Sequence, residues 1–147
     1  NARYVIRRVQ RIIDDCVRSH GIDPLDHQAM IQIYGALEKK LPIGHLAERL
    51  DVVPALASRL VRKLERNGLV RRTRSRTDRR ATYVSATAAG VRLLHAIVES
   101  VFHEVTYFQS KLSAQQQESA MEVFAFYVGL RPNFGRASIV GRNKKPA

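Results

Sequence analysis

Arginine and lysine side chains gather in one short stretch of this sequence, and the chemistry they offer there is the binding of phosphate. Between Arg59 and Arg80 lie ten Arg or Lys residues against only two acidic residues, Glu65 and Asp78, so this stretch has a net charge of +8. Residues 131–147 add five basic residues and no acidic one. Because the whole chain has a formal charge of +12, the rest of it is nearly neutral. A basic stretch confined to one part of a chain is typical of proteins that bind nucleic acid.

The composition is typical of one folded domain. We expect no cofactor. With 147 residues, 45% of them apolar and 26% charged, the chain can form a hydrophobic core. No apolar run reaches the roughly 20 residues that span a bilayer and no signal peptide is recognised, so we expect a cytoplasmic protein without a membrane partner. One cysteine excludes an internal disulfide, and the histidines lack metal-ligand spacing. With no glycine-rich phosphate loop and no paired nucleophile and base, we expect no enzymatic activity.

Apolar residues at helical spacing predict the elements that must position the basic stretch. Pro24 and Pro54 each suit the first turn of a helix, and the dipeptide Asn67-Gly68 is a typical helix end. The expected helices span residues 5–20, 23–37 or 23–39, 43–50 and 54–67.

The pattern then changes to two short β-favouring runs, residues 69–72 and 81–85, which predict a two-stranded hairpin with a basic loop. Thr87 can cap a long helix over residues 88–111, and Ser113 with Gln116 forms a capping-box pattern for a last helix to about residue 130. Residues 131–147 are expected to be flexible. The long helix carries a predicted heptad seam formed by Val91, Leu94, Val98, Val101, Val105 and Phe108.

A short helix, a tight turn, a basic helix and a hairpin form, in this order, a winged helix-turn-helix. Four segments resemble the MarR family of transcription regulators in their order and spacing, over roughly residues 23–94. The resemblance implies a homodimer with interlocking terminal helices, two lobes on a palindromic operator and often a small aromatic or phenolic effector. The four segments are residues 46–50 (LAERL), 58–72 (SRLVRKLERNGLVRR), 78–81 (DRRA) and 86–90 (ATAAG).

On the basic helix, the leucines are expected to face the core and the polar side chains to face double-stranded DNA. Ser58 and Arg59 lie toward its N-terminal half, the part that usually meets base edges in the major groove. Arg can bind guanine through O6 and N7, whereas Ser is less selective. Arg62, Lys63 and Arg66 are expected to contact phosphates, with ordinary solvated charges as the alternative.

The hairpin loop offers arginines to a narrow minor groove, where the negative potential is enhanced. These arginines are Arg74, Arg76, Arg79 and Arg80. The carboxylate of Asp78 is expected to hold the guanidinium of Arg80. The family resemblance assigns the inserted role to the Arg of this Asp-x-Arg, which is Arg80, and Arg79 is the alternative.

Two helix faces could line an effector pocket between the terminal helices and the DNA-binding lobe. They consist of His27, Ile31 and Tyr34 on one helix and of His103 and Tyr107 on the long helix. Side chains with this spacing also occur as ordinary packing residues. Cys16 could act as a redox switch, but its place on an apolar stripe favours an inert thiol.

The sequence therefore predicts a mainly α-helical protein with a small β-hairpin wing. Residues 23–87 would form the winged helix-turn-helix lobe, and residues 1–22 and 88–130 the dimerisation helices. The predicted function is sequence-specific binding of a palindromic operator by a homodimeric repressor that a small aromatic effector releases. The alternatives are a low-specificity architectural DNA-binding protein, a winged-helix module for protein contacts, and a redox-sensing regulator.

Overall fold

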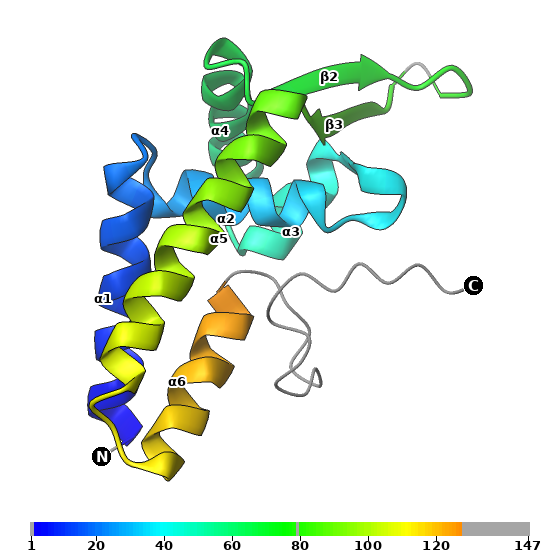
Figure 1. The fold of residues 1–147 in the computed structure, drawn as a ribbon. Coiled ribbons are helices and arrows are strands. Elements are labelled where there is room, and N and C mark those ends of the chain that lie inside the picture. Colours follow the sequence, from blue (N-terminus) through cyan, green and yellow to red (C-terminus); the bar gives the residue numbers. More distant parts are fainter. Residues whose placement is uncertain (1, 79, 128–147) are drawn as a thin grey trace, which may run out of the picture. The chain divides into compact units, whose positions relative to one another are not determined.

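A computed structural model of the chain describes residues 2–78 and 80–127 (Figure 1). Arg79, the basic tail of residues 131–147 and the predicted end of the last helix lie outside these ranges. The chain divides into two compact units. The winged-helix unit comprises Asp14–Ser100, and the terminal-helix unit comprises Asn1–Ile13 together with the chain from Val101 onward.

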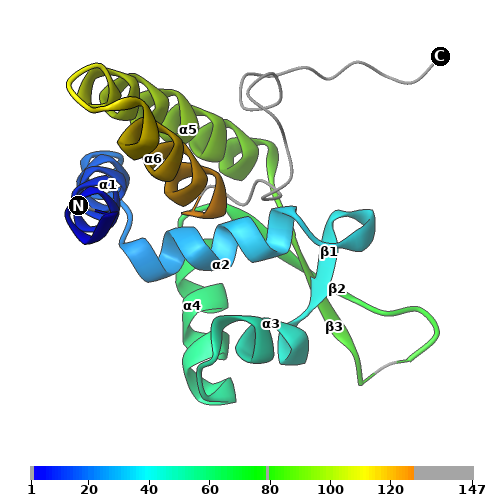
Figure 2. The ribbon, with the colours of Figure 1, turned by 90° about the horizontal axis from the view of Figure 1, so that it is seen from below.

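The winged-helix unit is mainly helical, as the sequence predicts. Figure 2 shows α3 and α4 beside α2, with the strands near the C-terminal end of α2, and contacts of α2 with α3, α4, β1 and β3 agree with this view. Its elements, some shared with the other unit, are α1 (Ala2–Ser19), α2 (Pro24–Tyr34), the 3-10 turn η1 (Leu37–Lys39), β1 (Lys40–Pro42), α3 (Ile43–Leu50), α4 (Pro54–Arg66), β2 (Val70–Arg74), β3 (Thr82–Ala86) and α5 (Ala88–Gln109).

The sheet has three strands, so the prediction of a two-stranded hairpin was incomplete. β3 lies in the centre and pairs antiparallel with β2 and with β1. Leu41 of β1 lies opposite Val84 of β3, and both side chains are buried. The second predicted helix accordingly stops at Tyr34, where the N–H of Gly35 bonds to the carbonyl of Ile31. The chain then turns through η1 into β1, the strand that was not predicted.

The core of this unit comes from the faces that the apolar spacing predicts. Small and branched side chains from three helices and the central strand are buried together, which excludes water from the inner side of α4. The buried side chains include Ala29, Met30, Ile33, Leu46, Ala47, Ala57, Leu60, Val61, Leu64 and Val84.

The start of α5 is fastened to the turn that follows α4. Gly68 has a φ of 71°, in the left-handed region that glycine adopts without strain. The hydroxyl of Thr87 donates to the carbonyl of Gly68 at 2.6 Å and accepts the N–H of Gly90 at 3.1 Å, so Thr87 caps α5 as predicted. A Cβ on Gly90 would overlap the carbonyl oxygen of Leu69. Gly90 is therefore needed for the close approach of this helix to the turn.

The terminal-helix unit holds the first part of α1, the second part of α5 and α6 (Ala114–Tyr127). Val5, Val9, Val101, Val105 and Phe124 are fully buried. The capping box that starts α6 is confirmed, because the amide oxygen of Gln116 accepts the N–H of Ser113 at 3.2 Å and the hydroxyl of Ser113 accepts the N–H of Gln116 at 3.4 Å.

The predicted seam of α5 is correct in part. Leu94, Val101 and Val105 are buried, but Val91, Val98 and Phe108 are only half-buried. Ile97, which the seam omitted, is fully buried. The strict heptad assumed for this helix thus misplaced its middle turn.

Candidate nucleic-acid interface

The residues of α4 form a buried face and an exposed face, and the half-buried residues between them are Leu56, Ser58, Lys63 and Glu65. The helix starts at Pro54 without a side-chain cap, since Val53 occupies the N-cap position. Ala57, Leu60, Val61 and Leu64 are buried. This face fixes the rotation of α4, so the polar residues of the opposite face must point outward.

Three arginines on α4 are free to bind a ligand. Arg59, Arg62 and Arg66 are exposed, and none of them forms an ion pair within the described part of the chain. Ser58 is half-buried, on the border between the exposed face and the core. The geometry thus leaves three guanidinium groups along one helix for phosphates or base edges.

Lys63, also predicted to contact phosphate, forms ion pairs with two carboxylates of the lobe, although 42% of its side chain is exposed. Its ammonium group lies 2.8 Å from a carboxylate oxygen of Asp26 and 3.0 Å from one of Asp23, both at the start of α2. The hydrogen bonds to Asp26 and then Asp23 raise the pKa of Lys63, so it stays charged. Two carboxylates therefore offset the charge that was expected to face DNA.

Arg72 on β2 also forms an ion pair within the lobe. Its Nε donates to a carboxylate oxygen of Glu65 on α4 at 2.6 Å. The neighbouring Arg71 is exposed, and it forms no ion pair with any described residue, so it joins the available cations. Sequence reasoning did not assign Arg71 to the site.

The loop of the wing has a polar framework of its own. The hydroxyl of Ser75 accepts the N–H groups of Thr77 at 3.2 Å and of Asp78 at 3.1 Å. The N–H of Ser75 bonds to the carbonyl of Ala81 at 2.9 Å, which closes the base of the loop. These bonds give the loop a defined turn even though its side chains are exposed.

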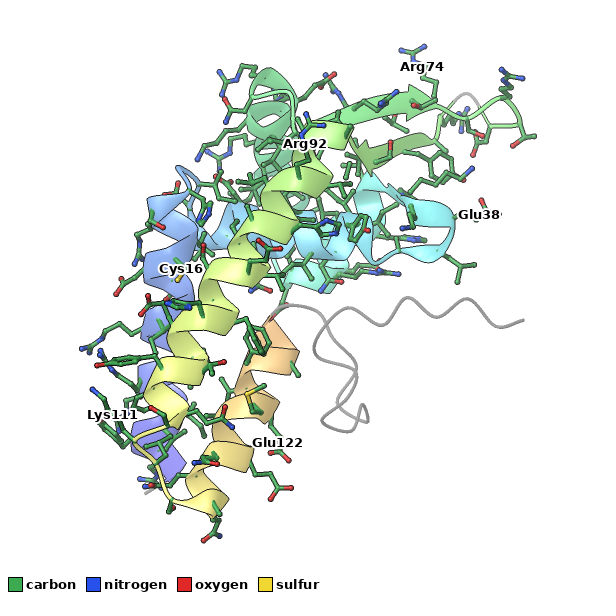
Figure 3. The ribbon with its side chains drawn as sticks, viewed as in Figure 1. Cys16, Glu38, Arg74, Arg92, Lys111 and Glu122 are labelled. Atoms are coloured by element: carbon green, nitrogen blue, oxygen red, sulfur yellow. The ribbon has the colours of Figure 1, made fainter. Side chains whose placement is uncertain are left out.

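Asp78 orients Arg80 by a different contact from the one expected. Its carboxylate accepts the backbone N–H of Arg80 at 3.0 Å, and within the described residues it forms no ion pair with the Arg80 guanidinium. The acid thus fixes the backbone and leaves the guanidinium free. Arg74, Arg76 and Arg80 are all exposed, and Figure 3 shows Arg74 extending from β2 away from the sheet.

The first predicted effector face is buried at His27 and half-buried at Ile31 and Tyr34. His27 is 1% exposed, and its Nε2 has no hydrogen-bond partner among the described residues. Burial lowers the pKa of His27 to about 4, so the ring is neutral at physiological pH. Ile31 is half-buried, and the ring of Tyr34 packs edge-on against His95 with the ammonium group of Lys39 above it.

The second predicted face belongs to the terminal-helix unit. His103 is exposed, and Tyr107 lies beside a cavity of about 400 Å³ with Tyr4, Arg8 and Phe108. Since His27, Ile31 and Tyr34 belong to the other unit, a single pocket formed by all five residues stays a prediction.

Comparisons with known proteins find relatives that are described as transcriptional regulators. A sequence model of the MarR family matches residues 20–81. The HTH-type transcriptional regulator MhqR of Bacillus subtilis is 27% identical over 123 residues, which cover 81% of this chain and 83% of MhqR. Over residues 20–81, the chain is therefore similar to the MarR family.

Solved structures show the same fold. The crystal structure of MepR, a transcription regulator of a Staphylococcus aureus multidrug efflux pump, has a TM-score of 0.70 at 20% identity, over 81% of this chain and 87% of MepR. A MepR–DNA complex has a TM-score of 0.61 at 22% identity, over 74% and 86% of the two chains. The predicted winged-helix fold is therefore confirmed.

Cys16 is buried on α1, where the sequence placed it (Figure 3). In the described ranges, no cluster of three or more His, Cys, Asp or Glu side chains could hold a metal ion. Nor do these ranges contain a helix with the length and apolar character required to cross a bilayer.

Proposed function

We propose that this chain is a MarR-family transcription regulator that binds double-stranded DNA as a homodimer, at a palindromic operator, and represses transcription there. The pairing of its cations carries the proposal, because Lys63 and Arg72 form ion pairs within the lobe. The other described basic residues of α4 and of the wing are exposed and form no ion pair with described residues. The exposed set consists of Arg59, Arg62, Arg66, Arg71, Arg74, Arg76 and Arg80.

The helix and the wing have different tasks in this proposal. Arg59, in the first half of α4, reaches base edges in the major groove. Arg80, held through its backbone by Asp78, enters a flanking minor groove and senses width and charge. Arg62 and Arg66 bind phosphates and set the register of the helix on the duplex.

The terminal-helix unit supports the dimer. Tyr4, Ile6 and Tyr107 are large apolar or aromatic residues that are 55%, 39% and 62% exposed, and a folded chain gains by covering such a surface with a second copy. Deletion of residues 1–22 is expected to abolish dimerisation. A stable, folded full-length monomer at micromolar concentration in sedimentation velocity would contradict this part of the proposal.

A small aromatic or phenolic effector is proposed to release the operator. The cavity beside Tyr107 has a volume in the range of ligand sites and is lined by aromatic rings and Arg8. Titration of the protein–operator complex with a panel of small phenols is expected to release the DNA, and Tyr107→Ala is expected to weaken that release. If no phenol in the panel changes operator affinity at millimolar concentration, this part of the proposal is wrong.

One observation favours an architectural DNA-binding protein as a second candidate. The start of α4 offers Val53, Pro54 and Ala55, which are exposed and have no polar side chain for base edges. Recognition of the DNA sequence through base edges would then depend on few residues of the protein. The affinity for DNA would come mostly from phosphate contacts.

Selection of bound duplexes from random DNA separates the two candidates. A sequence-specific dimer enriches an inverted repeat, and it binds this operator about 10³-fold or more tightly than a scrambled duplex at the same salt concentration. An architectural protein enriches no motif and binds both duplexes equally. For either candidate, neutralisation of about eight to ten phosphates lowers affinity about 10³- to 10⁵-fold between 50 and 200 mM salt.

A further inference from the structure

Three residues of α4 were predicted to bind phosphate: Arg62, Lys63 and Arg66. Among these three, Lys63 is the one whose charge is paired with carboxylates of the described chain. It lies in the last turn of α4, between the exposed Arg62 and Arg66, and yet its ammonium group turns to the start of α2. There it is held between the carboxylates of Asp26, at 2.8 Å, and Asp23, at 3.0 Å.

The two carboxylates differ in their surroundings. Asp23 is exposed, but Asp26 is only 2% exposed, so its carboxylate depends on Lys63 for a cation. Asp26 also lies in the first turn of α2, where the helix dipole favours a negative charge. A buried, oriented carboxylate of this kind fixes the position of the cation that it binds.

A second ion pair holds the other side of α4. Glu65 binds Arg72 of β2, so two opposite sides of the same helical turn are tied to α2 and to the sheet. The buried face of α4 between these ties consists of aliphatic side chains, which resist separation from the core but allow small rotations. Ion pairs on both sides limit such rotations.

We propose that Lys63 is a positioning residue, which through Asp26 and Asp23 sets the rotation of α4 and thereby the direction of Arg59 and Arg62. The proposal rests on the sequence-specific DNA binding proposed above and adds the contact that aligns the recognition helix. Lys63 contributes to discrimination between sequences, and its charge does not release a counterion on binding.

The test compares Lys63→Gln with Arg62→Gln, a matched change at the next residue of the same helix, on the selected operator and on a scrambled duplex over a range of salt concentrations. Arg62→Gln is expected to reduce the slope of log K against log salt by about one per protomer, with little change in the ratio of the two affinities. Lys63→Gln is expected to leave the slope unchanged and to lower that ratio about tenfold.

Two further variants complete the design. Lys63→Arg keeps a cation between the carboxylates and is expected to restore most of the ratio. Asp26→Asn leaves the exposed Asp23 as the carboxylate that pairs with the ammonium group. This weaker hold makes the group more available to phosphate, so the salt slope is expected to steepen while the ratio falls. Because loss of the buried carboxylate can impair folding, the Lys63 variants alone decide the matter if Asp26→Asn does not fold.

The outcomes separate the possible roles. If Lys63→Gln reduces the slope as Arg62→Gln does and keeps the ratio, Lys63 is a phosphate ligand and the proposal is wrong; no change in either quantity also overturns it. Hydrogen exchange of the α4 amides in the free protein is expected to be faster in Lys63→Gln than in Arg62→Gln. A wild-type protein without sequence preference would refute the proposed function, and the exchange rates would then decide the positioning role by themselves.

Discussion

His27 makes the stability of the winged-helix unit depend on pH. The ring is buried and neutral, with its pKa lowered from 6.5 to about 4 by the loss of water around it. The unfolded chain binds a proton on this residue below about pH 6.5, whereas the folded chain does so only near pH 4. The contribution of His27 to the free energy of unfolding is therefore complete above pH 6.5 and is lost as the pH falls toward 4.

The size of this effect follows from the two pKa values. A shift from 6.5 to about 4 corresponds to about 3 kcal/mol in full, and about 2 kcal/mol of it is lost between pH 7 and pH 5. This is a large part of the stability of an ordinary domain.

Urea unfolding of the wild type and of His27→Gln at pH 7 and pH 5 measures the effect. All other groups titrate in both proteins, so the difference between their pH dependences isolates His27. The wild type is expected to lose about 2 kcal/mol more than the variant over this interval. Equal losses in the two proteins would refute the assignment of a buried neutral ring.

Three further substitutions test the local contacts. Gly90→Ala is expected to destabilise the protein by about 2 to 3 kcal/mol in urea unfolding, because the new Cβ overlaps the Leu69 carbonyl, while Gly44→Ala, in open space on α3, is expected to be neutral or slightly stabilising; equal effects would contradict the packing. Thr87→Ala is expected to cost about 1 to 2 kcal/mol through loss of the α5 cap, and a change within error would show that the cap is dispensable. Asp78→Ala is expected to weaken binding to operator and scrambled duplexes equally, because it loosens the backbone at Arg80, and a selective loss on the operator would contradict this role.

Much of the fold could be predicted because its signals are local. Proline at the start of α4, glycine at residue 68 and the cap at Thr87 each depend on neighbours within a few residues, and the structure confirms all three. The exposed face of α4 followed from the helical spacing of its buried residues in the same way.

The missed features depend on contacts between distant parts of the chain. β1 is a three-residue strand that exists because β3 lies beside it, more than 40 residues later in the sequence, and no local pattern marks it. Lys63 and Asp23 are likewise 40 residues apart, so a lysine on a basic helix was read as a DNA contact. Local pattern also could not tell whether Asp78 would bind the backbone of Arg80 or its guanidinium.

The division of labour between helix and wing is tested most directly by measuring Arg59→Ala and Arg80→Ala on the selected operator and on duplexes changed at each single position. Arg59→Ala is expected to lose about 1 to 3 kcal/mol on the operator and to relax preference at one position in each half-site. Arg80→Ala is expected to weaken binding on all duplexes together, with a small bias against A·T-rich flanks. If Arg80→Ala left affinity unchanged while Arg59→Ala lowered it equally on every sequence, α4 would be only a backbone clamp and the assignment of roles would be wrong.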